Sequence, residues 1–167
     1  MFISDPFSDS VRINSFDFLP GAGMTSTQEN LFYNFKELYR NFNQDQVALI
    51  DDVYDKEIRF SDPVHEVSGL EAMKSYFNNI ASNLNYCRFE YLDEVHNGNS
   101  SYIKWLMIFS HPHLKNGEEI RLKGVSHIQY ENKIYLHEDF YDMGAMIYEH
   151  LPLLSHIVKN IKYKLKH

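Results

Sequence analysis

The sequence predicts an α+β fold in which three helices precede a long, strongly curved antiparallel sheet. Apolar residues recur at helical spacing through the first half of the chain, and the period changes to two at Tyr86. Turn signals then separate four long runs of alternating residues. The helices thus precede the strand meander in the chain. This order is typical of α+β folds, in which the helices lie together on one face of the sheet.

Three helices are expected before Tyr86. The first, of about 18 residues, carries one apolar face, made by Leu31, Phe32, Phe35, Leu38, Tyr39 and Phe42. Asp45 is a candidate cap for a shorter second helix that carries Val47, Ile50, Val53 and Tyr54. The run "EIRFSDP" then alternates as a short strand that stops at Pro63, and a third helix begins near Ser68-Gly69.

Four strands are expected at 86–96, 100–111, 118–130 and 133–142. The turns between them are Asn97-Gly98-Asn99, Asn116-Gly117 and Glu131-Asn132. Strands of this length exceed the usual ~5 to 6 residues, so the sheet should twist and curve.

Two-residue loops at Asn116-Gly117 and Glu131-Asn132 predict the register of the last three strands. Gly124 then faces Asp139 and lies beside Phe109, and Ser126 faces His137. Alternation gathers the expected pocket residues on one face: Trp105, Met107, Phe109, His111, Gly124, Ser126, Tyr135, His137, Asp139 and Tyr141. A three-residue loop at 97–99 adds Cys87, Phe89 and Tyr91 to that face, whereas a two-residue loop adds Arg88 and Glu90; burial favours the first.

His137 and Asp139 carry the candidate chemistry, because residues i and i+2 of a strand point the same way. Desolvation among apolar side chains raises the pKa of an aspartate, whereas a neighbouring imidazolium lowers it, and the sequence does not decide which effect wins. Gly124 either leaves ligand space in front of Asp139 or bends a long strand. Asp62 and His65 are expected at the pocket mouth, where Asp62 is a turn or cap residue and His65 contacts ligand or lies on the surface.

Three segments divide the chain: an N-terminal arm at 1–24, a pocket domain at 25–143 and a C-terminal extension at 144–167. The extension reads as an amphipathic helix that starts near Pro152, with Leu154, Ile157, Val158, Ile161 and Leu165 on one face. A cationic helix of this kind packs on its own domain or on a sister subunit, or lies on a membrane surface, and we favour packing.

Composition excludes several classes of protein. A formal net charge of -7 argues against nucleic-acid binding, and a single cysteine, Cys87, excludes an internal disulfide. No run approaches the ~18 apolar residues of a membrane span, which favours a cytoplasmic protein. His111, His113 and Glu118 have the ligand spacing of a cupin metal site, but Pro112 separates the histidines and no second motif follows, so we expect no metal.

Two stretches carry a family resemblance: "FSDPVHEVSGLEAMKSYF" at 60–77 and "RLKGVSHIQYENKIYLHEDFYD" at 121–142. With the element order, they resemble the SnoaL-like or nuclear-transport-factor-2-like superfamily, over about residues 26 to 142. The resemblance implies a cone-shaped pocket for a small apolar, oxygen-bearing molecule, and no cofactor.

The same resemblance implies roles for the candidate residues. Asp139 would be the acid/base of a cyclase or isomerase and His137 would orient it, the alternative being a noncatalytic binding protein. It also implies a homodimer through the opposite sheet face, which carries Val125, Leu136 and Phe140 among charged residues.

Overall fold

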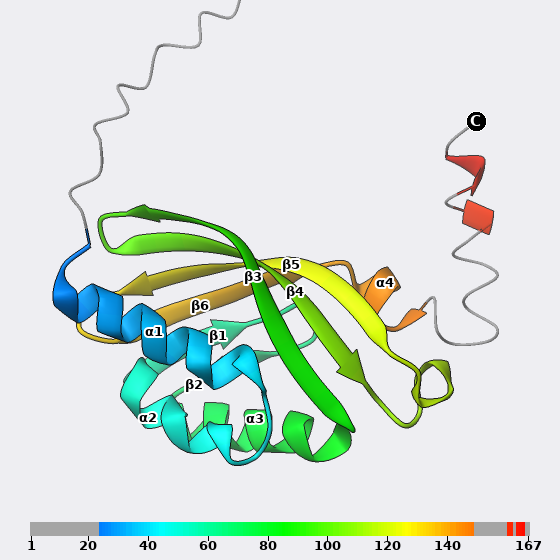
Figure 1. Cartoon of the computed structure of the whole chain (residues 1–167), viewed down its shortest axis with the longest axis horizontal. Helices are drawn as coiled ribbons and strands as arrows, with labels where there is room; N and C mark the ends of the chain where they lie inside the picture. Colours follow the sequence, from blue (N-terminus) through cyan, green and yellow to red (C-terminus); the bar gives the residue numbers. More distant parts are fainter. Residues whose placement is uncertain (1–23, 149–159, 162, 166–167) are drawn as a thin grey trace, which may run out of the picture.

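The computed structural model describes residues 24–148, 160, 161 and 163–165. In Figure 1 the helices lie under the concave side of a curved sheet, which confirms the predicted fold class. The arm, except for Met24, and most of the predicted C-terminal helix lie outside the described residues. Within that helix Ile161 and Leu165 are exposed.

Helix α1 (Ser26–Arg40) is the longest of the described helices. Its N-terminus is a capping box, in which Thr25 and Gln28 each accept from the other's backbone N–H. The predicted face is buried, but the helix ends at Arg40, before Phe42.

The second predicted helix is divided into two short elements. The 3-10 turn η1 (Gln46–Leu49) leads into the α-helix α2 (Ile50–Val53). The Asp45 side chain makes no capping bond, and Asn43 instead accepts from the backbone N–H groups of Asp45 and Gln46. Helix α3 (Leu70–Asn83) follows Gly69, whose φ of 87° is readily available to glycine.

The sheet is mixed, which corrects the expectation of a wholly antiparallel sheet. Its strands are β1 (Tyr54–Ser61), β2 (Glu66–Ser68), β3 (Tyr86–Asn97), β4 (Ser100–Ser110), β5 (Ile120–Tyr130) and β6 (Ile134–Tyr141). Their order is β2-β1-β6-β5-β4-β3, and β1 pairs parallel to β6. Strand β1 thereby covers the edge that the meander would leave unpaired at its last strand.

The predicted pairing of Gly124 with Asp139 is wrong by two residues. Gly124 lies opposite Tyr141, and Ser126 lies opposite Asp139. The turn holds three residues, 131–133, and a further register shift follows between Gln129 and Tyr130. A shift of two residues keeps the side chains from Leu136 to Tyr141 on their predicted faces, so Asp139 still points toward the helices. Ile134 and Tyr135, which flank the irregularity, do not keep theirs.

The predicted pairing of Gly124 with Phe109 is also wrong, because Trp105 occupies that place. Strand β4 ends at Ser110, just before Pro112, which has no N–H to give to a ladder. A wide loop with the 3-10 turn η2 (Lys115–Gly117) replaces the expected tight hairpin.

The prediction that Cys87, Phe89 and Tyr91 join the pocket face is confirmed, for a different reason. They pair with Phe109, Met107 and Trp105 across β3 and β4, although the loop of that hairpin has two residues. A β-bulge between Tyr91 and Asp93 adds the one residue by which the loop is shorter than predicted. The side chains of Cys87, Phe89 and Tyr91 therefore lie on the predicted face.

Candidate functional site

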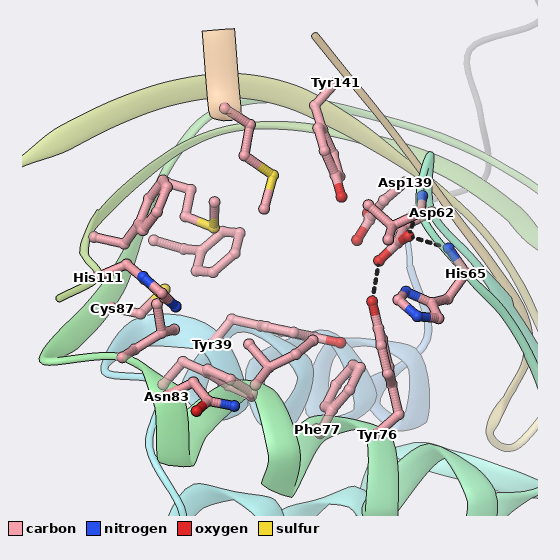
Figure 2. Close-up of a pocket in the computed structure, with 18 of the residues that line it drawn as sticks. Tyr39, Asp62, His65, Tyr76, Phe77, Asn83, Cys87, His111, Asp139 and Tyr141 are labelled. Carbon is pink, nitrogen blue, oxygen red and sulfur yellow. Dashed lines mark hydrogen bonds between the residues drawn. The ribbon is translucent and has the colours of Figure 1, made fainter. Parts of the chain in front are cut away.

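A cavity of about 470 Å³ lies between the helices and the concave face of the sheet (Figure 2). Its walls come from α1, α3, β1, β3, β4, β6 and α4. Aromatic and aliphatic side chains supply most of the lining: Tyr39, Phe42, Phe60, Val64, Tyr76, Phe77, Ile80, Leu84, Phe89, Trp105, Met107, Phe109, Leu114, Tyr141, Met146 and Ile147. The remaining lining residues are Asp62, His65, Asn83, Cys87, His111 and Asp139. This volume and this chemistry suit a small, largely apolar molecule.

A chain of buried hydrogen bonds runs from α1 to Asp139. The Tyr39 and Tyr54 hydroxyls lie 2.6 Å apart, and the Tyr54 hydroxyl lies 2.8 Å from His137 Nδ1. His137 Nε2 in turn lies 3.0 Å from Asp139 Oδ1. Only 1% of His137 is exposed, and its ring packs against Tyr54, Phe60 and Phe35.

This chain is satisfied when His137 is neutral with its proton on Nε2. An ionised Asp139 only accepts, so Nε2–H donates to it and Nδ1 accepts from the Tyr54 hydroxyl. The Tyr54 oxygen then accepts from Tyr39. Burial raises the pKa of both tyrosines well above its usual value, so both hydroxyls keep their protons.

A second chain reaches Asp139 from the sheet. Trp105 Nε1 donates to Ser126 Oγ at 2.9 Å, and the Ser126 hydroxyl donates to Asp139 Oδ1 at 2.5 Å. Asp139 Oδ1 therefore accepts two bonds. Among the described residues no donor is bonded to its other oxygen, Oδ2, although Asp139 lines the cavity.

Gly124 makes room for Trp105 rather than for a ligand. A Cβ at position 124 would lie 2.2 Å from Cη2 of the indole, far inside van der Waals contact. The glycine lets the ring lie across β5 and reach Ser126. The sequence offered ligand space or a bend in the strand as the role of this glycine, and the structure shows space for an indole ring instead.

The polar end of the cavity gathers Asp62, His65, Tyr76, Asp139 and Tyr141 (Figure 2). Asp62 Oδ1 accepts from the backbone N–H groups of Val64 at 2.7 Å and His65 at 2.8 Å, as a turn residue does. Asp62 Oδ2 accepts from the Tyr76 hydroxyl at 2.5 Å, which ties the β1–β2 loop to α3.

Two more tyrosines at this end are held protonated. Burial is the main cause that raises the pKa of Tyr76, and the hydrogen bond to Asp62 adds to it. Burial also raises the pKa of Tyr141, with the charges of Asp62 and Asp139 as further causes. The Tyr141 hydroxyl is thus a hydrogen-bond donor in the cavity wall, two residues from Asp139 on the same strand.

Other titratable groups lie at the far end of the cavity in Figure 2. Burial raises the pKa of the Cys87 thiol to about 12, so it is not a nucleophile near neutral pH. Burial, together with neighbouring His113, lowers the pKa of His111. Within the described residues there is no group of three His, Cys, Asp or Glu side chains arranged to hold a metal ion.

The residues predicted from the sequence fall into three groups. The cavity wall holds Asp62, His65, Trp105, Met107, Phe109, His111, Asp139 and Tyr141. Ser126 and His137 are buried behind Asp139, and Gly124 lies under Trp105. Tyr135 lies elsewhere, in a surface depression with Asp55, Glu131, Asn132 and Lys133.

Sequence reasoning missed the contribution of the tyrosines before the meander. Tyr39 and Tyr76 line the cavity, and Tyr54 holds His137, yet all three occur in apolar patterns that indicated only core packing. The sequence signal that could have identified them is the tyrosine hydroxyl within an apolar pattern, because a buried tyrosine needs a hydrogen-bond partner.

Solved structures share this fold. An NTF2-like protein of unknown function from Burkholderia pseudomallei has a TM-score of 0.63 at 14% identity, over 73% of this chain and 95% of that one. A putative SnoaL-like polyketide cyclase from Jannaschia has a TM-score of 0.63 at 10% identity, over 75% and 94%. An M. tuberculosis epoxide hydrolase described as LEH-like has a TM-score of 0.59 at 9% identity, over 73% and 87%. At these identities the likeness shows the fold alone.

The fold and the cavity under its concave sheet define an NTF2-like α+β domain. A model of the SnoaL-like domain matches residues 35–137, and the chain belongs to that family. A search of curated proteins found no match. Within the part of the chain that the structure describes, no helix is long and apolar enough to cross a membrane.

Proposed function

We propose that this protein binds a small, largely apolar, oxygen-bearing molecule in the cavity, and that Asp139 transfers a proton to or from it. The observation that supports this proposal is that the two carboxylate oxygens of Asp139 differ in their hydrogen bonds. Oδ1 is fixed by Ser126 and His137, while Oδ2 has no protein donor among the described residues, and Asp139 lines the cavity. A carboxylate held in this way meets the geometric demand on a general base.

The step we propose is removal of a proton from carbon next to a carbonyl group. Asp139 Oδ2 takes the proton, and the electron pair of the C–H bond moves into the carbonyl to form an enolate. The Tyr141 hydroxyl is the available donor to the developing oxygen anion. Return of the proton from Asp139 to the same carbon gives exchange, and its return to another carbon gives isomerisation.

The family supports this class of reaction without specifying it. Neighbours in fold are described as a putative polyketide cyclase, a putative isomerase and an epoxide hydrolase. All three descriptions name enzymes, and none transfers a substrate to this chain.

The test combines ligand binding with carbon–hydrogen exchange. The chain has one tryptophan, Trp105, and it lines the cavity, so its fluorescence reports occupancy. 2-Tetralone in D2O serves as the probe, and NMR follows loss of the protons next to its carbonyl. We expect Asp139→Asn to lower the catalysed exchange by about 10²- to 10⁴-fold while the change in fluorescence persists. The amide oxygen of asparagine can still accept from Ser126 and His137, so the cavity should keep its shape.

Glu138→Gln is the matched control, because it removes the same charge from the neighbouring residue on the other face of β6, where Glu138 contacts His127. Exchange should be unchanged in this variant. Binding without exchange above background in the wild-type protein would instead support the alternative, a noncatalytic ligand-binding protein. Absence of any fluorescence response would contradict the choice of cavity and ligand class.

Two further expectations remain proposals: a cytoplasmic location and a homodimer formed by the outer sheet faces. The outer face carries exposed Tyr102 and Phe140. His127 lies between Tyr102 and Glu138 in the ladder, stacked on Tyr102 and 2.8 Å from Glu138. A mixture of aromatic and charged groups of this kind suits a polar interface.

A further inference from the structure

The side chains that line the cavity carry negative charge without a matching positive charge. Asp62 and Asp139 are the acidic residues of the lining, and among the described lining residues there is no lysine or arginine. We propose that the ligand is a cation, an apolar amine whose ammonium group occupies the end of the cavity formed by Asp62, Tyr76, Asp139 and Tyr141. This inference rests on the proposed function, since it takes the same cavity as the binding site.

Neutral groups satisfy Asp62. It accepts from two backbone N–H groups and the Tyr76 hydroxyl. Asp139 accepts from Ser126 and from His137. Neither carboxylate has a lysine or arginine partner in the described part of the chain. The charge of Asp62 is thus stabilised by hydrogen bonds without being cancelled by a cationic side chain of the described residues.

Aromatic rings surround the same end of the cavity. Tyr76 and Tyr141 stand beside the carboxylates in Figure 2, and Tyr39, Phe60 and Trp105 also contribute to the wall. Ring faces attract ammonium groups, and the attraction grows where water is excluded. A site that combines carboxylates with aromatic rings thus favours a ligand that has both a cationic group and an apolar part.

Among the described residues, the opposite end of the cavity has no lysine or arginine that would hold an anion. Burial and neighbouring His113 lower the pKa of His111, which favours its uncharged form at neutral pH. A carboxylate or phosphate ligand would therefore face two carboxylates without a lysine or arginine partner in the described lining. Like charges that lie close together repel, and this disfavours anionic ligands.

A positive ligand also suits the proposed proton transfer. When Asp139 takes a proton from a neutral ligand, the enolate that forms shares the cavity with ionised Asp62. A cationic group on the ligand offsets this negative charge and makes a nearby C–H bond more acidic. The same feature therefore favours binding and stabilises the enolate, although an ammonium group next to Asp139 also makes that carboxylate a weaker base.

The test compares three probes that share a phenyl ring: phenyltrimethylammonium, its neutral isostere tert-butylbenzene, and benzenesulfonate. Each is titrated into the full-length protein, with Trp105 fluorescence as the readout. We expect the cation to bind at least about 10-fold more tightly than the neutral isostere, and the anion not to bind. Asp62→Asn should remove most of this preference while keeping the turn, because the amide oxygen still accepts from Val64 and His65.

Glu66→Gln is the control, since it removes one negative charge from an exposed position on β2 outside the cavity lining. It should leave the preference unchanged. Equal or tighter binding of tert-butylbenzene would overturn the cation inference and leave the proposed apolar cavity standing. Failure of all three probes to change the fluorescence would overturn both.

Discussion

Gly124→Ala should displace Trp105 and destabilise the protein. The new Cβ would lie 2.2, 2.4 and 2.8 Å from three atoms of the indole, whereas ordinary contact begins at 3.4 Å. The ring must therefore move by about 1.2 Å, the difference between 3.4 and 2.2 Å. The ring can move only away from β5, toward the cavity that it lines, and it then leaves the packed position in which it is 3% exposed.

The cost has two parts. Overpacking of a filled core costs roughly 1 to 3 kcal/mol. Loss of the 2.9 Å bond from the indole to Ser126 adds roughly 1 kcal/mol. We therefore expect a fall of about 2 to 4 kcal/mol in the free energy of unfolding, together with a changed emission spectrum of Trp105. Urea denaturation followed by circular dichroism measures the first, and fluorescence of the native protein the second.

A double-mutant cycle isolates the clash. Trp105→Phe removes the outer indole atoms, so Gly124→Ala should cost at least about 1 kcal/mol less in that background. Ser126→Ala is the control for the hydrogen bond alone, because it introduces no new atom near the ring. Equal costs of Gly124→Ala in both backgrounds, or an unchanged unfolding midpoint in the single variant, would refute the assignment of Gly124 as the space for Trp105.

Two other predictions concern the hydrogen-bond chain and the sheet face. Tyr54→Phe leaves His137 Nδ1 without its donor, so it should cost roughly 1 to 3 kcal/mol and allow a second tautomer in the ¹⁵N NMR spectrum of His137. Tyr39→Phe, one bond further away, should leave the Nε2–H tautomer dominant. A wild-type His137 that carries its proton on Nδ1 would contradict the chain. For the sheet face, Phe140→Lys should convert the proposed dimer to monomers in sedimentation velocity, because it adds a charge to a side chain that is 56% exposed on the outer face. Tyr33→Lys, on α1 and 63% exposed, is the matched control and should not change the association state. A wild-type monomer, or a dimer that survives Phe140→Lys, would rule this interface out.

The sequence by itself determined the class of fold and the face on which most residues of the last three strands lie, with Ile134 and Tyr135 as exceptions. Helical and two-residue periods are local properties, and an error of two or four residues in the register leaves them intact. For this reason Asp139 and His137 point toward the helices as expected, even though their predicted partners across β5 were wrong.

Only the tertiary structure decided how those residues are connected. The bulge after Tyr91, the three-residue turn at 131–133 and the wide loop before β5 depend on packing across strands, which no local pattern records. The same holds for the partners of Asp139 and His137. Tyr54 comes from β1, 83 positions away from His137 in the chain, and meets it because β1 pairs parallel to β6. The sequence determined that an aspartate faces the helices, and long-range packing decided that its Oδ1 accepts from Ser126 and His137.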